Sequence, residues 1–242
     1  EMLDQLDELG IADNTIVFYS TDNGVHYNTW PDAGITPFRS EKNSNWEGAY
    51  RVPAMVRWPG KIAPGRVSNE IMSHLDWMPT LVAAAGDPDL KQDLLKGKRV
   101  GSKQSKLHLD GYNFLPYLTG EVETGPRQVF VYHNDGGMPV CLRMGDWKLV
   151  YAENRAQTMA LWAEPEVTLR LPKIFNLRRD PFERADHNSN TYWDWVIDKA
   201  PRVYLGSAAT TQYLQTFASY PPSQRPDSWS IDKLTEQFLK ER

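Results

Sequence analysis

The sequence predicts an α/β fold that is followed by a smaller α+β unit with an antiparallel sheet. Apolar residues recur at helical spacing from Met2 to Leu9 and end at Gly10, and a β-branched and aromatic run follows at residues 15–19. Such a run is typical of a strand buried on both faces, as in a parallel sheet. Several short strands in close succession after residue 126 are typical of an α+β unit.

The elements of the first unit can be placed from their end signals. A second strand is expected at residues 54–58, where apolar residues precede Pro-Gly. A helix is expected at about residues 77–85, with Asp76 as its N-cap and Gly86 at its end. Residues 87–106 are polar and rich in lysine, so we expect them to form a surface excursion.

The elements of the second unit are shorter and closer together. Strands are expected at residues 129–132, 140–143, 147–151 and 173–177, the second and third joined by a Met-Gly-Asp hairpin. An amphipathic helix is expected at residues 231–239.

The change from an alternating helix and strand pattern to closely spaced strands near residue 126 predicts two domains. Residues 1–125 would form part of an α/β domain with flanking helices, and residues 126–242 a small α+β domain with an antiparallel sheet and a terminal helix.

Composition excludes several classes of partner. The 242 residues are 40% hydrophobic, and 27 basic and 31 acidic residues give a net charge of −4. This balance gives no reason to expect nucleic acid or an anionic membrane as a partner. No run approaches the roughly 18 apolar residues of a membrane span. A single cysteine excludes an internal disulfide framework.

The segment Ser-Thr-Asp-Asn-Gly at residues 20–24 directly follows the first strand. Asp-Asn-Gly is ordinary turn chemistry, because Asp and Asn bond their own backbone and Gly accepts a positive φ. In open α/β sheets, however, ligands bind beyond the carboxyl ends of the strands, which is where Asp22 and Asn23 fall. The sequence therefore leaves a turn and a binding site as alternatives here.

Several longer segments settle which family the chain is similar to. After STDNG come TPFRSEKNSNWEGAYRVPAMVRWPGKI and SHLDWMPTLVAAAGD, and later LDGYNFLPYLTGE, LRMGDWKLVY and IFNLRRDPFERADHN. In this order and spacing they closely resemble the carboxyl-terminal half of the sulfatase family, the arylsulfatases of the alkaline phosphatase superfamily. The similarity covers most of residues 15–188.

The resemblance implies a role for four residues. Asp22 and Asn23 match two oxygen ligands of a divalent cation, usually calcium in this family, with magnesium as the alternative; such oxygens suit a hard cation. Lys42 matches the catalytic lysine that contacts the sulfate and stabilises charge on the leaving oxygen. His26 would line the substrate pocket, although a loop histidine is also an ordinary polar surface residue.

Other polar residues of these motifs have structural interpretations. His74 and Asp76 look like a metal-binding pair, but the resemblance places them at the start of a structural helix, where capping and packing are expected. Asp32 and Arg39 would shape the mouth of the pocket.

The chain lacks parts that the family uses. The family's nucleophile is a formylglycine made from Cys or Ser in a C/S-x-P-S/A-R motif, which these residues do not contain. Cys141 is followed by Leu-Arg-Met and is interpreted as a small buried hydrophobe. The family's paired aspartates are also missing. The resemblance thus implies the later half of a longer enzyme, and we expect the 242-residue chain alone to be inactive.

The expected function is hydrolysis of a sulfate ester, with a sulfated small molecule or carbohydrate as substrate. Two alternatives stay open: a phosphonate or phosphate ester hydrolase of the same superfamily, and a non-catalytic sulfatase-like binding fragment. Family habit places such proteins in the periplasm or outside the cell. Monomer and oligomer both remain open.

Overall fold

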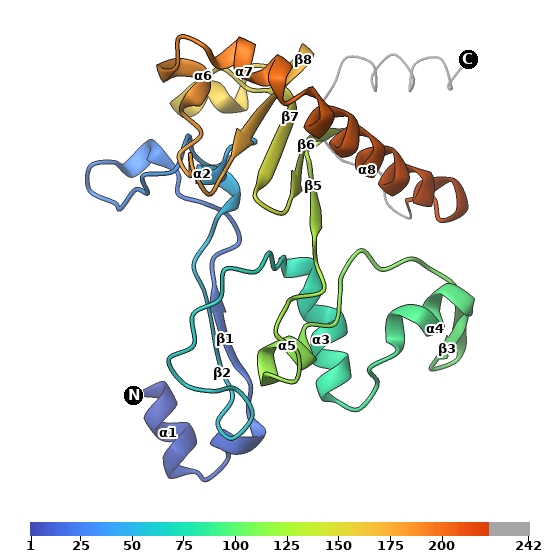
Figure 1. Ribbon diagram of the computed structural model, residues 1–242. Helices are drawn as coiled ribbons and strands as arrows, with labels where there is room; N and C mark the ends of the chain where they lie inside the picture. The colour runs from blue at the N-terminus through green and yellow to red at the C-terminus, as the bar shows by residue number, and fades with distance from the viewer. Residues whose placement is uncertain (223–242) are drawn as a thin grey trace, which may run out of the picture.

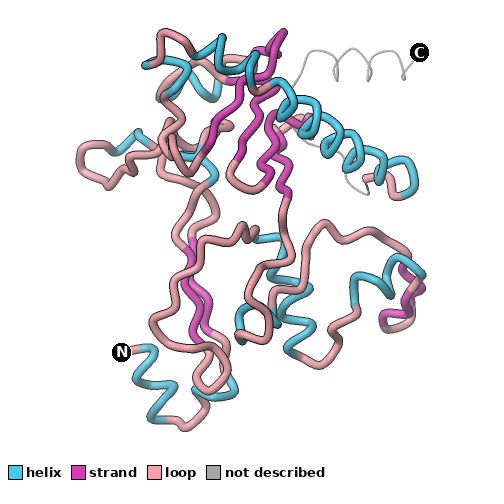
Figure 2. The backbone as a smooth tube through the Cα atoms, viewed as in Figure 1, coloured by secondary structure: helices cyan, strands magenta, loops and turns pink. Residues whose placement is uncertain are grey.

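The computed structural model describes residues 1–222 of the chain. Figure 1 shows two lobes, which we call the strand-pair lobe and the sheet lobe. The strand-pair lobe contains a two-stranded ribbon and short helices, and the sheet lobe is built on a four-stranded sheet. A bridging loop, residues 21–53, leaves the ribbon, runs along the sheet lobe and returns; it is mostly loop in Figure 2.

The ribbon of the strand-pair lobe follows a short first helix. Helix α1 (Met2–Glu8) ends before Gly10, whose φ of +66° needs a glycine, as the sequence predicts. A 3₁₀ turn, η1 (Ala12–Asn14), leads into strand β1 (Val17–Ser20). Strand β2 (Ala54–Arg57) lies antiparallel to β1, with Ser20 opposite Ala54. The second predicted strand is therefore confirmed.

The prediction that β1 is buried on both faces, as in a parallel sheet, is wrong for these residues. Within residues 1–222, β2 is its one neighbour, and the pair is antiparallel. One face is covered, since the Phe18 ring lies 4.0 Å from that of Trp77. The other face leaves Tyr19 55% and Met55 62% exposed. An apolar run indicates a strand, but it does not identify which neighbours cover it.

Helix α3 (Trp77–Ala84) confirms the helix predicted after Asp76. Its start differs in detail, because a 3₁₀ turn, η3 (His74–Asp76), precedes it and Ser73 is the capping residue. The Asp76 carboxylate accepts the Ser73 and Tyr112 amides, both at 2.8 Å, and a bidentate pair from Arg127 at 2.8 and 2.6 Å. The structural interpretation of Asp76 is confirmed, and its partners tie α3 to the segment entering the sheet lobe.

Residues 87–106 are more ordered than a surface excursion. They form helix α4 (Leu90–Lys96) and a hairpin of β3 (Lys98–Val100) and β4 (Lys103–Ser105). Leu90 and Leu94 are buried, which explains why this lysine-rich stretch folds onto the lobe. Helix α5 (Leu115–Thr119) follows and packs near α3 (Figure 1).

The sheet lobe confirms the predicted antiparallel strands. They are β5 (Val129–His133), β6 (Pro139–Met144), β7 (Trp147–Glu153) and β8 (Val167–Asn176), ordered β5-β6-β7-β8. The β6–β7 hairpin turns at Gly145, whose φ is +57°. Strand β8 starts earlier than expected. The largest buried cluster lies on this sheet and includes Val140, Leu142, Leu149 and Phe175.

Four helical segments complete the sheet lobe. The β7–β8 connection holds a 3₁₀ segment, η4 (Thr158–Trp162). Helices α6 (Ala185–Asn188), α7 (Tyr192–Asp198) and α8 (Ala200–Ser219) follow β8. Helix α8, which the sequence interpretation did not include, runs beside the sheet in Figure 1. Gly206 lets it approach closely, because a Cβ there would collide with Leu149.

Two remaining expectations concern the chain as a whole. The helix expected at residues 231–239 lies outside the described residues, and the division at residue 125 stays a prediction. Within residues 1–222, no helix combines the length and apolar character that crossing a bilayer requires.

A buried ionic group fixes the bridging loop to the sheet lobe. Helix α2 (Glu47–Tyr50) of this loop starts at Glu47, which is 2% exposed. The Lys148 ammonium of β7 is fully buried and lies 3.1 Å from Glu47 Oε1 and 2.8 Å from Glu183 Oε1. Glu183 Oε2 also accepts the Glu47 amide at 2.8 Å. Tyr132 donates its hydroxyl to Glu47 Oε1 at 2.9 Å.

The charges of this group are set by opposing effects on the pKa values. Burial alone would raise the pKa of Glu47, but Lys148 and Arg143 hold it below its ordinary value. Burial raises the pKa of Glu183, with Lys148 opposing that rise and Glu47 adding to it. Burial opposes the charge on Lys148, yet the two carboxylates hold its pKa well above the usual value. The Lys148 ammonium therefore forms ion pairs with two carboxylates, Glu47 and Glu183.

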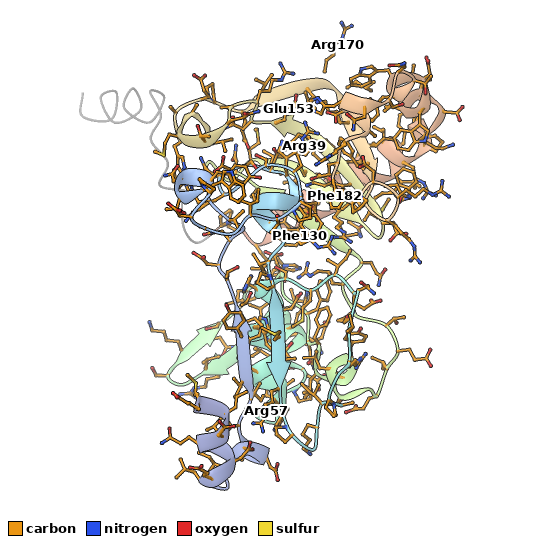
Figure 3. The ribbon with its side chains drawn as sticks, turned by 90° about the vertical axis from the view of Figure 1, so that its left-hand side faces the viewer. Arg39, Arg57, Phe130, Glu153, Arg170 and Phe182 are labelled. Carbon is orange, nitrogen blue, oxygen red and sulfur yellow. The ribbon has the colours of Figure 1, made fainter. Side chains whose placement is uncertain are left out.

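A second set of ion pairs ties the bridging loop to α6. Arg39 Nη1 contacts both the Glu183 carbonyl and Asp186 Oδ1 at 2.9 Å, and its guanidinium stacks 3.5 Å from the Trp46 ring centre. Lys173 of β8 joins Asp186 to Glu153 at 2.9 and 2.7 Å. In Figure 3, Arg39 lies among the side chains of the sheet lobe, whereas Arg57 lies on the ribbon.

Replacing Arg127 should lower the free energy of unfolding of the protein. Arg127→Leu leaves the fully buried Asp76 carboxylate without its cation, and we expect a loss of about 3–5 kcal/mol in the free energy of unfolding. Chemical denaturation of the complete protein measures it. The matched control is Arg170→Leu, an exposed arginine of β8, with an expected change within about 0.5 kcal/mol. Equal effects of the two variants would contradict this.

Replacing Lys148 should make stability depend on pH in a defined direction. In Lys148→Met, the pKa of Glu183 rises further above its unfolded value of about 4.3, because the opposing cation is gone. A folded pKa above the unfolded one stabilises only while the carboxyl is protonated, and that contribution disappears as pH rises through the folded pKa. The stability deficit relative to wild type should therefore be larger near neutral pH than at about pH 4.5.

The size and control of the Lys148 effect can be stated. Removing one partner of a buried ion pair costs about 3–5 kcal/mol, and we expect this at neutral pH in denaturation of the complete protein. Lys199→Met, which changes an exposed lysine of the same lobe, should give a small deficit that does not vary with pH. A Lys148→Met deficit that grows toward acid would refute the assignment.

Candidate functional site

The site predicted from the sequence lies where the bridging loop leaves the ribbon. Two backbone hydrogen bonds fold this loop onto itself. The Gly24 amide donates to the Ala49 carbonyl at 2.7 Å, and the Lys42 amide donates to the Val25 carbonyl at 2.8 Å. The segment that follows Asp22 and Asn23 therefore lies directly against the segment that carries Lys42.

Two glycines make this close approach feasible. A Cβ on Gly24 would collide with the Gly48 carbonyl, and one on Gly48 would collide with the carbonyls of Arg39 and Ser40. Neither glycine needs a positive φ, so the requirement here is space rather than backbone conformation. The glycines of Asp-Asn-Gly and Trp-Glu-Gly thus allow the same close packing of backbone segments. The turn interpretation of Asp-Asn-Gly does not explain this contact.

Asp22 and Asn23 keep oxygen atoms free at the end of β1. Asp22 is exposed, and among residues 1–222 its carboxylate makes no hydrogen bond or ion pair. Asn23 is half-buried and donates its Nδ2 to the Gly24 carbonyl at 2.8 Å, which leaves its side-chain oxygen available. Nearby, Ser20 Oγ donates to the Pro53 carbonyl at 2.9 Å and contacts His74 Nε2 at 3.1 Å, which anchors the strand end.

These donors fit a hard cation in kind but not in number. Carboxylate and amide oxygens are the ligands that calcium and magnesium prefer, whereas calcium takes about six to eight of them. Within the described part of the chain, no group of three or more His, Cys, Asp or Glu side chains is arranged to hold a metal ion. Any ion bound at Asp22 and Asn23 would need further oxygen ligands besides these two side chains.

Lys42 offers a cation without a protein partner. The residue is half-buried, and among residues 1–222 its ammonium makes no hydrogen bond or ion pair. It lies 6.0 Å from the centre of the Trp162 ring. This differs from Lys148 and Lys173, whose ammonium groups are each held by two carboxylates. Lys42 can therefore bind an anion without first breaking an ion pair.

The neighbouring Glu41 is a structural clamp. It is 2% exposed and accepts the Tyr27 amide at 2.7 Å and the Thr158 amide at 3.0 Å. Its carboxylate thus joins η2 (Tyr27–Thr29) of the bridging loop to η4 of the sheet lobe. Burial, and then the charge of Glu41, raises the pKa of Tyr27. Lys42 is consequently next to a residue that joins two parts of the structure, η2 of the bridging loop and η4 of the sheet lobe.

His26 lies beside Lys42 but is engaged by the protein. Its Nδ1 accepts the Asn28 amide at 3.1 Å, and its Nε2 faces the indole N–H of Trp162 at 3.1 Å. A neutral imidazole accepts at one ring nitrogen only, so each tautomer keeps one of these bonds. Glu41 Oε2 lies 3.6 Å from Nδ1. The structure brings His26 and Lys42 to one place; substrate binding by His26 stays a prediction.

Two clefts of the described chain are lined by other residues. One of about 570 Å³ lies beside Phe38, Arg39 and Phe182. The other, of about 610 Å³, lies beside Trp147 and Trp195. Asp22, Asn23 and Lys42 line neither. Arg39 borders the first cleft, and its guanidinium is held by Asp186. That Asp32 and Arg39 shape the mouth of the pocket stays a prediction.

Cys141 is the small buried residue that the sequence indicates. It is fully buried in β6, and burial raises the pKa of its thiol to about 12. Its sulfur accepts a hydrogen bond from Asn45 at 3.1 Å. Such a thiol is neither ionised nor accessible at neutral pH.

Sequence reasoning missed two residues of this site, Glu41 and Trp162. Glu41 stands next to Lys42, and a carboxylate amid Lys and Asn gives no sign of burial. Trp162 is separated from His26 by 136 positions. Its segment, Leu-Trp-Ala-Glu-Pro, carries no sequence signal that would place it beside His26. The structure shows that the hydrogen bond from the Thr158 amide to Glu41 brings this segment to the site.

The chain is similar to known sulfatases over most of its length. Residues 1–87 match the family model described as Sulfatase. The chain is 34% identical to steryl-sulfatase of Mus musculus over 205 residues, which covers 76% of this chain and 30% of that protein. It is 31% identical to N-acetylgalactosamine-6-sulfatase of Homo sapiens over 200 residues, covering 76% and 35%.

Solved structures agree with the sequence matches. The chain superposes on the PsFucS1 sulfatase from Pseudoalteromonas sp. with a TM-score of 0.72 and 25% identity, over 93% of this chain and 42% of that one. The predicted fold class, that of the alkaline phosphatase-like sulfatases, is thereby confirmed. The chain spans about a third of the curated relatives it matches. By sequence and by fold, this chain belongs to the sulfatase family.

Proposed function

We propose that the complete protein carrying this chain hydrolyses sulfate esters to an alcohol and inorganic sulfate. The observation that supports this most is the free ammonium of Lys42, held by backbone pairing against the strand end that carries Asp22 and Asn23. An unpaired cation beside two free oxygen donors suits an anionic group that also contacts a metal ion. The names of the matched relatives point the same way.

In this proposal Lys42 binds the sulfate group and stabilises the leaving oxygen. Hydrolysis breaks the bond between sulfur and the bridging oxygen, an oxygen from water ends on sulfur, and the alcohol takes up a proton. Negative charge develops on the bridging oxygen as that bond breaks. A fixed ammonium offsets this charge without giving up its proton, and the ion pairs around the bridging loop keep it in position.

Asp22 and Asn23 would hold part of a divalent cation site, with calcium expected and magnesium as the alternative. When bound, such an ion polarises the oxygens of the sulfuryl group. The two residues contribute a carboxylate oxygen and an amide oxygen from the tip of β1, and the bond from Ser20 to Pro53 keeps that tip in place. His26 would line the pocket beside them.

The nucleophile is not supplied by these residues. A formylglycine provides an activated hydroxyl in the family that the sequence resembles, and Cys141 does not fit as its precursor, because it is buried in β6 and lacks the surrounding motif. We therefore propose that residues 1–242 alone do not turn over sulfate esters. The substrate would be a sulfated small molecule or carbohydrate, and the protein would act in the periplasm or outside the cell.

Two rivals remain distinguishable. A phosphonate or phosphate ester hydrolase would share the metal pair, and parallel rates on aryl sulfate and aryl phosphonate esters separate it. A non-catalytic binding fragment is the third candidate. If the gene encodes neither a C/S-x-P-S/A-R segment nor paired aspartates before Glu1, the catalytic proposal fails and binding takes its place.

Asp22→Ala should lower metal content and turnover together. Losing a charged ligand should reduce turnover of an aryl sulfate by at least about 100-fold, while the exposed position keeps the fold intact. Elemental analysis of the purified complete protein measures the bound calcium and magnesium. Asp89→Ala, at an exposed aspartate just before α4, is the matched control and should leave both values unchanged.

Lys42→Ala should lower turnover and leave the metal bound. Loss of one group that stabilises developing charge reduces the rate by about 10²- to 10³-fold. The metal content should match wild type, which separates this variant from Asp22→Ala. Lys61→Ala removes an exposed lysine elsewhere and should behave as wild type. Normal turnover in Lys42→Ala would remove this lysine from the mechanism.

A further inference from the structure

A large apolar ring is displayed next to Lys42 by the sheet lobe. Trp162, at the end of η4, is 51% exposed. Full burial of such a side chain would remove 150–250 Å² from water, so an indole left half in solvent at a polar site calls for an explanation. It comes from the β7–β8 connection, far in the sequence from Lys42.

The backbone under Trp162 is firmly held. The carbonyl of Leu161, a buried residue, accepts Asn43 Nδ2 at 2.7 Å and Asn154 Nδ2 at 3.1 Å. The segment begins at Thr158, whose φ of +54° is uncommon for a residue other than glycine. The Glu41 carboxylate fixes the Thr158 amide. The connection therefore has one defined conformation, and the bridging loop that carries Lys42 is part of what defines it.

The ring of Trp162 is also oriented. Its indole N–H points to His26 Nε2 at 3.1 Å. The two rings are nearly parallel, at 16° with 6.0 Å between their centres. Lys42 Nζ lies 6.0 Å from the indole centre. Trp162 is still 51% exposed as a residue, so the contact with His26 leaves part of its surface available to a ligand.

The distance from Lys42 suits a ligand with two parts. A sulfate ester joins a compact anion to an organic group through one oxygen. If Lys42 holds the anion, the organic group starts within a few ångströms of the ammonium, and the centre of the indole ring lies 6.0 Å from that ammonium. Flat aromatic rings and the C–H faces of sugars pack well on such a surface, and most binding sites combine apolar walls with few polar groups.

We propose that Trp162 is the surface that binds the ring of the alcohol part of the sulfate ester, while Lys42 binds the sulfate. The inference rests on the proposed function. It assigns the preference for ring-containing alcohols to the β7–β8 connection of the sheet lobe, and not to the strand end that carries Asp22 and Asn23.

The test compares two esters in the complete protein. Trp162→Leu should lower kcat/KM for 4-nitrophenyl sulfate by about fivefold to tenfold, the value of one aromatic stacking contact. For ethyl sulfate, which has no ring, it should change by less than about twofold. Trp193→Leu, at a tryptophan of α7 that is 48% exposed, is the matched control and should change neither. Inhibition by inorganic sulfate should be equal in all variants.

Trp162→Phe separates ring binding from support of His26. It keeps an aromatic face and removes the indole N–H that points to His26. Ring binding predicts that the Phe variant keeps most of the activity on 4-nitrophenyl sulfate. If Phe and Leu variants instead lose activity equally on both esters, Trp162 acts only by positioning His26 and the inference is wrong.

A binding measurement makes the test independent of turnover. Ligand-observed NMR with 4-nitrophenol, the alcohol product, should show weaker binding to Trp162→Leu than to wild type and Trp193→Leu. If wild type turns over neither ester, the proposed function fails, and this measurement still decides the role of Trp162. If wild type is active and Trp162→Leu shows unchanged ester preference and unchanged 4-nitrophenol binding, the inference alone fails.

Discussion

The enclosure of one ammonium by two buried carboxylates is the constraint on which the rest of this structure depends. Lys148 reaches Glu47 and Glu183 in a region without solvent, where an unmatched charge is costly. Glu47 begins the helix that closes the bridging loop, so pairing it inside the sheet lobe fixes where that loop lies. Lys148 of β7 therefore helps to fix the position of the candidate site through its ion pair with Glu47.

Structural and functional charges are separated within the bridging loop. The charges that shape the loop are buried or half-buried and have partners: Arg39 and Glu47 form ion pairs, and Glu41 accepts backbone amides. The charges at the candidate site, on Asp22 and Lys42, are left without partners in residues 1–222. This separation lets a binding site present unpaired charge while its backbone stays in place. At the candidate site, backbone hydrogen bonds and close glycine contacts hold the two segments together.

Local patterns predicted the strands, the first helices and the family, and they did so for physical reasons. Side-chain periodicity and turn residues act over a few positions, which is why β1, β2 and the β6–β7 hairpin were found. Burial by distant partners is not a local property. Three features depend on residues far along the chain. They are the exposure of Tyr19, the burial of Lys148 in a strand whose sequence looks ordinary, and the contact of Trp162 with His26. Asp22 and Lys42 were found by motif resemblance, and the structure adds that their segments are adjacent.

The ribbon of β1 and β2 has a consequence for the protein's dynamics. Within residues 1–222 each of its strands has one hydrogen-bonded neighbour, whereas β6 and β7 have two. Amide hydrogens of such a narrow ladder open to solvent through local fluctuations far smaller than global unfolding, and those of a packed inner strand do not. We therefore expect the ribbon end that carries Asp22 and Asn23 to be less protected than the inner strands β6 and β7. Any partner that covers Tyr19 and Met55 would also restrain the segment that carries Asp22 and Asn23.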